Sequence, residues 1–425
     1  MPTPVSVSHF LPVLLLLFAR VTAMAAAGPQ AWQPVVVKGA QLPAMLGAPI
    51  DSLEVLAGHD GRLQPIPFQV DVSAPTIASG SASRCSPPTA NRAPLRPNDE
   101  LAVMLGDLGE RANVKTPLPR GALELAVRDP PGGPEHFAYV ASVKSPQRSA
   151  VWYVQFNDSA ERVETDSYRF GLRHGWPRDF SLQRYRFAQG PNLLNALTVS
   201  LSARLFGLIP FATTEHALRS GQPIVTCGPV RVTLHYSYSV RLIGGLRSPS
   251  IVVPFIFYRR YIVCPFAIRF PWLPRLFFRD TRIRVSLDYN ATPDTLLLWQ
   301  GSKVGLPINA DRALGHQATV MDPGPSVEWL ALRQDGQLLI QGFPPTTDFD
   351  MIGHYLTYHE PVDGTGPIPG TRRVIIGYEF RQLEALSAGK HVFEGCVAVL
   401  DGAADPQTFF SELHPAPVVV HQLIP

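Results

Sequence analysis

The most distinctive chemistry in this sequence lies in a long basic and aromatic stretch. Between His216 and Arg279 there are 64 residues with nine Arg and no Asp or Glu. Guanidinium groups bind carboxylates and phosphates in a bidentate manner and stack on aromatic rings. The stretch therefore predicts a face that binds an anionic or amphipathic ligand. The candidate ligand-binding residues are Arg231, His235, Tyr236, Tyr258, Arg259, Arg260, Arg269 and Trp272.

Two other interpretations of the same stretch stay open. In the first, it is a wide apolar core whose Arg side chains reach out to solvent along their own stems. In the second, it is part of an enzyme that acts on acidic polysaccharide. A lyase of that kind needs a Tyr or His base beside an Arg that neutralises a uronate, and His235, Tyr236, Tyr258 and Arg260 supply those residue types.

Other chemical motifs are weaker. The sequence has neither a Gly-x-Ser-x-Gly nucleophile motif nor a phosphate-binding Gly-rich loop. Asp348, Asp350, His354, His359 and Glu360 lie close together, but an extended chain would divide them between two faces. We therefore predict no metal site and no cofactor.

Four cysteines are present, none of them in a Cys-x-x-Cys pair. An even number in an exported chain favours disulfides. If residues 230–242 and 251–263 form an antiparallel hairpin in which facing residue numbers sum to 491, Cys227 faces Cys264 within disulfide reach. The sequence therefore predicts a disulfide between Cys227 and Cys264.

The elements that must position these residues are β-strands. Pro (43) and Gly (33) are abundant, which limits long helices. Apolar and polar residues alternate with a period of two through 197–205, 230–242 and 283–289. Hairpins are expected for 53–72, 122–143, 327–343 and 372–400, and one short helix is expected after Asp405-Pro406. The predicted class is all-β: stacked antiparallel sheets, as a β-sandwich or super-sandwich, with very little helix.

The chain is also expected to be exported. Residues 11–19 form an uncharged apolar run followed by small residues, which is typical of a signal peptide. We predict a signal peptide at 1–27, an N-terminal β domain at 28–146 and a larger β-sandwich domain at 147–425. The expected location is the periplasm or cell envelope of a bacterium.

Several short motifs carry a resemblance. Pro65-Ile66-Pro67-Phe68-Gln69-Val70-Asp71, Asn98-Asp99-Glu100-Leu101, Gly106-Asp107 and Gly228-Pro229-Val230-Arg231-Val232 resemble a group of exported bacterial proteins without assigned function. The Gly-Pro-Val-Arg stretch is also similar to a strand in large β-sandwich carbohydrate enzymes, including some polysaccharide lyases. In the first group an acidic loop is expected between the two N-terminal motifs. Residues 73–96 here contain no acid, so no functional residue is carried over.

Two classes of function follow from the sequence. The main prediction is a non-catalytic envelope protein whose partner is an anionic glycan, a lipid headgroup or an envelope protein, with peripheral membrane contact as a further option. The alternative is a carbohydrate-active enzyme, a lyase or hydrolase. The net charge of +3 does not indicate nucleic acid. The oligomeric state is not predicted.

Overall fold

The computed structural model describes most of the chain after its N-terminal segment. The described residues are 32–73, 93–113, 116–128, 133–172, 182–187, 190, 192–214, 218–220, 223–240, 251–270, 278–302, 305–308, 319–321, 327–343, 352–359, 361, 368–413 and 418–422. The predicted signal peptide lies outside these ranges.

The N-terminal part contains two small antiparallel sheets. One has the order β1-β5-β4, with β1 at Pro34–Lys38, β5 at Glu100–Met104 and β4 at Phe68–Asp71. The other has the order β28-β6-β7-β2-β3, with β28 at Val418–Gln422, β6 at Leu123–Arg128, β7 at Glu135–Ser142, β2 at Leu53–His59 and β3 at Arg62–Pro65. Their inner faces share one apolar core that includes Val37, Leu53, Leu101 and Leu125.

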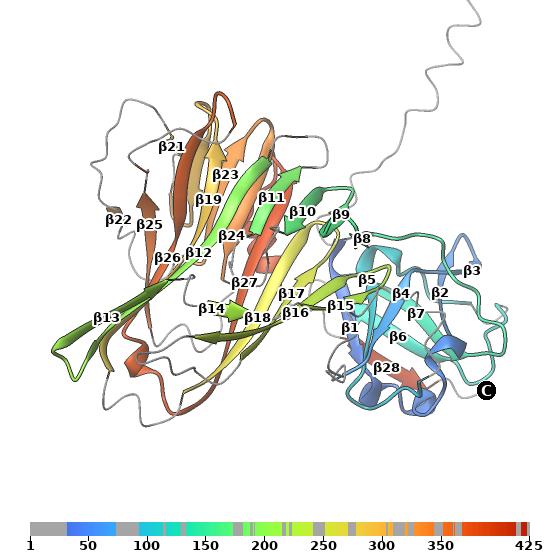
Figure 1. Cartoon of the computed structure of the whole chain (residues 1–425). Coiled ribbons are helices and arrows are strands. Elements are labelled where there is room, and N and C mark those ends of the chain that lie inside the picture. The colour runs from blue at the N-terminus through green and yellow to red at the C-terminus, as the bar shows by residue number, and fades with distance from the viewer. Residues whose placement is uncertain are drawn as a thin grey trace, which may run out of the picture.

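The larger part is built from two sheets of ten described strands each (Figure 1). The first sheet contains β22 (Thr319–Met321), β25 (Gly353–His359), β26 (Arg372–Arg381), β19 (Phe278–Ala291), β12 (Asn192–Leu205), β11 (Leu182–Phe187), β10 (Tyr168–Leu172), β9 (Arg162–Thr165) and β8 (Val154–Asn157), with β13 (Ile209–Thr214) beside β12. The second contains β14 (Leu218–Ser220), β16 (Val232–Val240), β17 (Ile251–Phe257), β18 (Tyr261–Phe270), β27 (Gly389–Asp401), β24 (Gln337–Gly342), β23 (Trp329–Gln334), β20 (Leu296–Trp299) and β21 (Leu306–Pro307), with β15 (Ile224–Cys227) beside β16.

These sheets confirm the predicted fold class. All their pairings are antiparallel, and a large apolar core lies between them. The only α-helix among the described residues is α2 (Pro406–Glu412), and Asp405 caps it by accepting hydrogen bonds from the amides of Gln407 and Thr408. The expected Asp-Gly turns are present too, because Asp60, Gly61, Asp335 and Gly336 all have the positive φ that such turns require.

One predicted hairpin is wrong. The strands expected at 372–380 and 391–400 exist, as β26 and β27, but they do not pair with each other. β26 pairs with β19 and β25 in the first sheet, whereas β27 pairs with β18 and β24 in the second. The chain between them crosses from one sheet to the other through a short 3-10 helix at Leu383–Ala385, which replaces a hairpin turn.

The C-terminal strand departs from the predicted division of the chain, which placed all of 147–425 in the larger domain. β28 pairs with β6, so Val418 lies opposite Val127 and Gln422 lies opposite Leu123. The last described residues therefore belong to the N-terminal five-stranded sheet. A third apolar cluster, with Trp32 and Ala102 from one part and Tyr261 and Phe410 from the other, joins the two parts.

Candidate functional site

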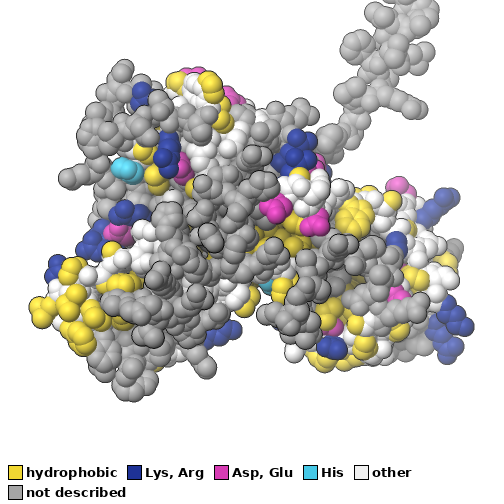
Figure 2. All heavy atoms as spheres, viewed as in Figure 1, with side chains coloured by type: hydrophobic (Ala, Val, Ile, Leu, Met, Phe, Trp, Pro, Cys, Tyr) yellow, Lys and Arg dark blue, Asp and Glu magenta, His cyan; other side chains and the backbone are white. Residues whose placement is uncertain are grey.

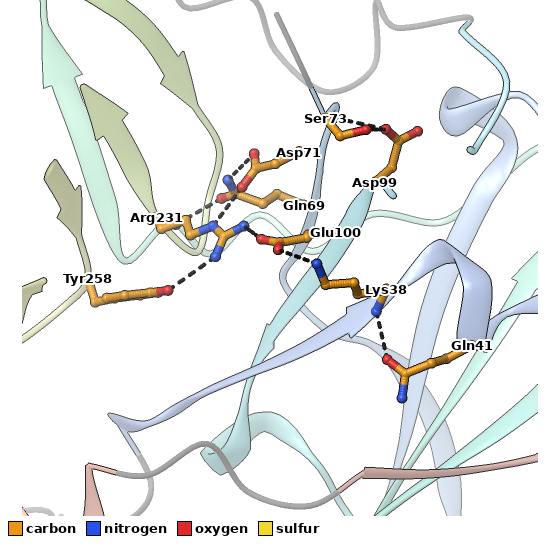
Figure 3. A network of polar contacts seen from close by, with 9 residues as sticks. All are labelled: Lys38, Gln41, Gln69, Asp71, Ser73, Asp99, Glu100, Arg231 and Tyr258. Carbon is orange, nitrogen blue, oxygen red and sulfur yellow. Dashed lines mark hydrogen bonds and ion pairs between the residues drawn. The ribbon is translucent and has the colours of Figure 1, made fainter. Parts of the chain in front are cut away.

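Arg231 is the centre of a polar network between the two parts of the molecule (Figure 3). Its Nε donates to Asp71 Oδ2 at 2.6 Å, and its Nη2 donates to Glu100 Oε2 at 2.7 Å. Its Nη1 donates to the Tyr258 hydroxyl at 3.1 Å. The side chain is only 6% exposed. The predicted ligand-binding Arg thus has acids of β4 and β5 as its described partners.

Gln69 completes this junction. Its Oε1 accepts hydrogen bonds from the backbone amides of Val230 at 3.1 Å and Arg231 at 2.8 Å, and its Nε2 donates to Asp71 at 2.7 Å. A Cβ atom on Gly228 would lie 2.3 Å from Gln69 Oε1, so a side chain there would collide with it. The glycine allows the two domains to approach closely.

The short motifs that carried the sequence resemblance therefore have a structural explanation. Gln69 and Asp71 come from the first motif, Glu100 from the second, and Gly228 and Arg231 from the fourth. They come together across the domain junction, where burial of a charge demands paired acids. Such motifs fix how the domains are joined and do not by themselves indicate catalysis.

The other candidates, on β16 and in the turn between β17 and β18, divide between two surroundings. Tyr258 is buried beside Arg231, and its ring stacks on Tyr261 at a centroid distance of 4.9 Å. Burial lowers the pKa of His235, while nearby Asp71 opposes that shift. Tyr236 is fully buried in the core between the large sheets. The predicted set therefore does not share one environment.

Arg259 takes part in a second polar cluster, the Asp107 cluster, which consists of His59, Asp107, Tyr153, Asp166 and Arg259. Arg259 Nε donates to Asp166 Oδ2 at 2.9 Å, and its guanidinium lies 5.2 Å from the centroid of the Tyr153 ring. The Tyr153 hydroxyl donates to Asp107 Oδ1, and His59 Nε2 lies 3.1 Å from the Asp107 carbonyl oxygen.

Asp107 has an unusual environment. Burial raises its pKa to about 6, although the hydrogen bond from Tyr153 and the charge of Arg259 oppose the shift. Its Oδ2 is buried without a hydrogen-bond partner among the described residues. Burial also raises the pKa of Tyr153. Sequence reasoning missed this cluster, since its members come from five separate segments.

The remaining candidates are less informative. Arg260 is half-buried, and its carbonyl oxygen accepts a hydrogen bond from the Val399 amide at 3.0 Å. Only the backbone of Arg269 is described, and Trp272 lies outside the described residues. A common Arg and aromatic face for a ligand therefore stays a prediction.

The predicted disulfide between Cys227 and Cys264 is wrong, because Cys264 is a free thiol. The β16–β17 hairpin does form, but Val232 lies opposite Phe257, so the facing numbers sum to 489. Neither strand includes its cysteine, since β16 begins after Cys227 and β17 ends before Cys264. The chain turns at Gly228, which places Cys227 on β15, and it turns again after Phe257, which places Cys264 on β18 opposite Gly395.

A cavity lies between the two large sheets. Its volume is about 320 Å³, and nearly all of its surface is apolar. Alternate residues along β12, namely Leu197, Val199 and Leu201, line it. The other lining residues are Phe170, Leu194, Thr213, Thr214, Tyr238, Ile251, Val253, Phe255, Ile262, Cys264, Ile283, Val285, Leu287, Gln341, Gly342, Phe343, Gly395, Cys396 and Val397.

The alternation of β12 explains why the cavity is apolar. Every second side chain points between the sheets, while Thr198 and Ser200 lie on the other face. Leu197, Val199 and Leu201 are only half-buried, so the two sheets do not close over them. The alternation was visible in the sequence, but the space between the sheets was not.

Some kinds of site were not found in the part of the chain that is described. No helix there is both long and apolar enough to cross a membrane. No group of three or more His, Cys, Asp or Glu side chains among the described residues could hold a metal ion.

No family model matches the chain, and no curated protein matches it. Solved structures do. An α-mannosidase from Enterococcus faecalis V583 is 11% identical, with a TM-score of 0.49, over 93% of this chain and 45% of the mannosidase. The heparan sulfate lyase HepC from Pedobacter heparinus is 11% identical, with a TM-score of 0.34, over 62% of this chain and 38% of the lyase.

A putative aldose 1-epimerase from Escherichia coli K12 is also 11% identical, with a TM-score of 0.35, over 56% of this chain and 97% of the epimerase. The chain spans less than half the length of the mannosidase and of the lyase. Carbohydrate-active enzymes are thus among the structures that this chain is similar to. At 11% identity the likeness concerns the fold, and no functional residue is transferred from these proteins.

Proposed function

We propose that this protein binds an amphipathic molecule and holds its apolar chain in the cavity between the two large sheets. The observation that carries the proposal is the nearly complete absence of polar surface in a cavity of about 320 Å³. Cavities of roughly 300–1,000 Å³ are typical of ligand sites. Water binds poorly in an apolar cavity. In contrast, each CH₂ group of a ligand that moves from water into the cavity contributes about 0.8 kcal/mol to the free energy of binding.

The ligand's polar end is expected to remain outside the cavity. The lining offers few polar side chains, chiefly Tyr238, Thr213, Thr214 and Gln341. Arg204, Arg279 and Arg282 are exposed on the neighbouring ends of β12 and β19, and they suit an anionic headgroup. We therefore favour a molecule with one anionic end and a long aliphatic chain.

The test is a titration with cis-parinaric acid, a fluorescent long-chain fatty acid. The wild-type protein should show saturable binding. Val199→Trp fills the cavity from β12 and should weaken binding at least about 10-fold, because overpacking leaves no space for the chain. Val252→Trp adds the same ring to the exposed face of β17, between the lining residues Ile251 and Val253, and should bind as the wild type does. Absence of saturable binding, or equal binding by Val199→Trp, would refute the proposal.

The Asp107 cluster favours a second candidate function, a carbohydrate-active enzyme. A carboxyl group with a pKa of about 6 is poised to donate a proton near neutral pH, and Arg259 could bind an acidic sugar. The raised pKa of Tyr153 disfavours it as the base of a lyase. The cluster therefore fits a hydrolase better than a lyase.

A panel of acidic polysaccharides tests this candidate. Hydrolysis releases reducing ends, whereas elimination creates an unsaturated uronate that absorbs in the ultraviolet. Asp107→Asn should abolish either activity, and Glu110→Gln, at an exposed neighbouring position, should not. If no polymer is cleaved, or if Asp107→Asn remains as active as the wild type, this candidate fails.

We also propose that the protein is exported and works in the cell envelope. The apolar run at 11–19 and the small residues after it support this proposal. Sequencing the N-terminus of the mature protein from fractionated cells tests it. A start near residue 26 or 28 in the envelope fraction is expected, and an intact N-terminus in the cytoplasmic fraction would contradict it.

A further inference from the structure

The hairpin between β12 and β13 ends in exposed apolar side chains. Phe206 is 59% exposed, Leu208 is 83% exposed and Ile209 is 57% exposed. Figure 1 shows this hairpin projecting from the body of the molecule, and Figure 2 shows hydrophobic side chains gathered at the same place with Lys or Arg side chains beside them. Large apolar side chains in such a position favour contact with an apolar partner.

The geometry of the turn does not explain these residues. The Leu208 amide donates to the Leu205 carbonyl oxygen at 3.1 Å, and Phe206 and Gly207 have φ values of 54° and 72°. Such two-residue turns favour Asn-Gly or Asp-Gly. Elsewhere the chain uses Asp335-Gly336 for the same purpose. A Phe in this left-handed conformation is strained, and strain of this kind often marks a functional position.

The two faces of the hairpin differ. The inner face continues the cavity lining outward from Leu201 through Ala203 and Leu205. On this face Phe211 of β13 lies beside Phe278 of β19, with ring centroids 6.4 Å apart. An apolar track therefore leads from the cavity to the end of the hairpin.

The outer face is basic. Arg204 lies opposite Arg279, and Ser202 lies opposite Arg282. All three Arg residues are exposed. Asp280 Oδ2 is 3.5 Å from Arg204 Nε, and both side chains are 61% exposed, so water screens this pair and little of the positive charge of Arg204 is lost.

We propose that this hairpin inserts its tip into an anionic lipid bilayer. Phe206, Leu208 and Ile209 enter the boundary of the acyl chains, while Arg204, Arg279 and Arg282 contact phosphate headgroups. Apolar side chains flanked by exposed Arg match the layers of a bilayer surface, where acyl chains lie directly beneath negative charge. In combination with the proposed ligand site, the apolar track would let a lipid chain pass between bilayer and cavity.

Vesicle co-sedimentation of the full chain tests the insertion. Vesicles of phosphatidylcholine with 30% phosphatidylglycerol should bind the wild type, and vesicles of pure phosphatidylcholine should bind it at least about 10-fold more weakly. In the Phe206→Asn/Leu208→Ser double variant, the turn gains the favoured Asn-Gly pair while the tip loses two apolar side chains. Its binding to the anionic vesicles should be at least about 10-fold weaker than that of the wild type. Val419→Ser, at an exposed apolar position on β28, is the matched control and should bind normally.

A second readout keeps the proposal open to refutation if the double variant folds poorly. The emission of Leu208→Trp should shift to the blue on anionic vesicles and be quenched by brominated lipid. Unchanged emission while the protein sediments with vesicles would overturn the proposal. So would self-association through the tip, seen by sedimentation velocity without any vesicle binding.

Insertion and the proposed ligand site can fail separately. The Phe206→Asn/Leu208→Ser variant should still bind cis-parinaric acid in solution, and Val199→Trp should still bind vesicles. Loss of both properties in both variants would indicate misfolding, which the circular dichroism spectra of the two proteins would reveal.

Discussion

Removing the Arg231 guanidinium should loosen the junction between the two parts of the molecule. Arg231→Met keeps much of the stem but leaves Asp71 without its cation and leaves Glu100 with only Lys38, whose Nζ lies 3.8 Å from Glu100 Oε1. Breaking a buried ion pair costs roughly 3–5 kcal/mol. Asp71 and Glu100 are 17% and 34% exposed, so water partly compensates them and the lower end applies. We therefore expect a loss of about 3 kcal/mol.

Hydrogen exchange of the amides in β4 and β5 measures this loss locally, because unfolding of a chain with several domains need not be a single transition. Their protection should fall about 100-fold, the equivalent of about 3 kcal/mol. Arg259→Met is the matched control. Its side chain is 33% exposed and its partner Asp166 is 54% exposed, so it should cost less than about 1 kcal/mol.

A double-mutant cycle with Asp71→Asn isolates the pair. The coupling between the Arg231→Met and Asp71→Asn changes should be at least about 1 kcal/mol, since the two groups are in contact. Equal effects of Arg231→Met and Arg259→Met, or additive changes in the cycle, would refute the view that this network holds the domains together.

Three further outcomes are expected. Because burial raises the Asp107 pKa from 3.8 to about 6, the folded state favours the protonated acid. The protonated acid therefore stabilises the folded state below pH 3.8, and this contribution, about 3 kcal/mol in total, is lost as the pH rises to about 6. The free energy of unfolding of Asp107→Asn, measured in urea, should lack this dependence on pH. Burial raises the pKa of Cys264 to about 12, so iodoacetamide at pH 8 should modify it only after unfolding, as mass spectrometry would show. Gly377→Ala would place a Cβ 2.1 Å from the Val285 carbonyl oxygen and should cost more than about 2 kcal/mol in urea unfolding, whereas Gly353→Ala meets only the Tyr355 ring at 3.2 Å and should cost less than about 1 kcal/mol.

Which side chains face inward on a strand was predictable from the sequence. The alternation in β12, β16 and β19 places apolar residues on one face because successive side chains point to opposite sides. The Asp60-Gly61 turn and the Asp405 helix cap were predictable for a similar reason, since both depend on a few neighbouring residues. Fold class followed from these local features together.

Pairing between distant strands could not be predicted in this way. A period of two specifies a face but not a partner, so β26 and β27 were expected to pair and instead lie in different sheets. The C-terminal β28 joins β6, almost three hundred residues earlier, through backbone hydrogen bonds that carry no signature in the side chains.

The candidate sites depend on tertiary structure for the same reason. The sequence by itself determined that Arg231 stands in an acid-free segment and that β12 has an apolar face. Only the fold decided that Asp71, 160 residues away, neutralises Arg231. Only the separation of the two large sheets left a cavity between Val199 and the strands that it faces. The arrangement of whole sheets determines which group pairs with a buried charge and which residues cover an apolar face. Electrostatic and packing energies depend on distance in space and not on distance along the chain.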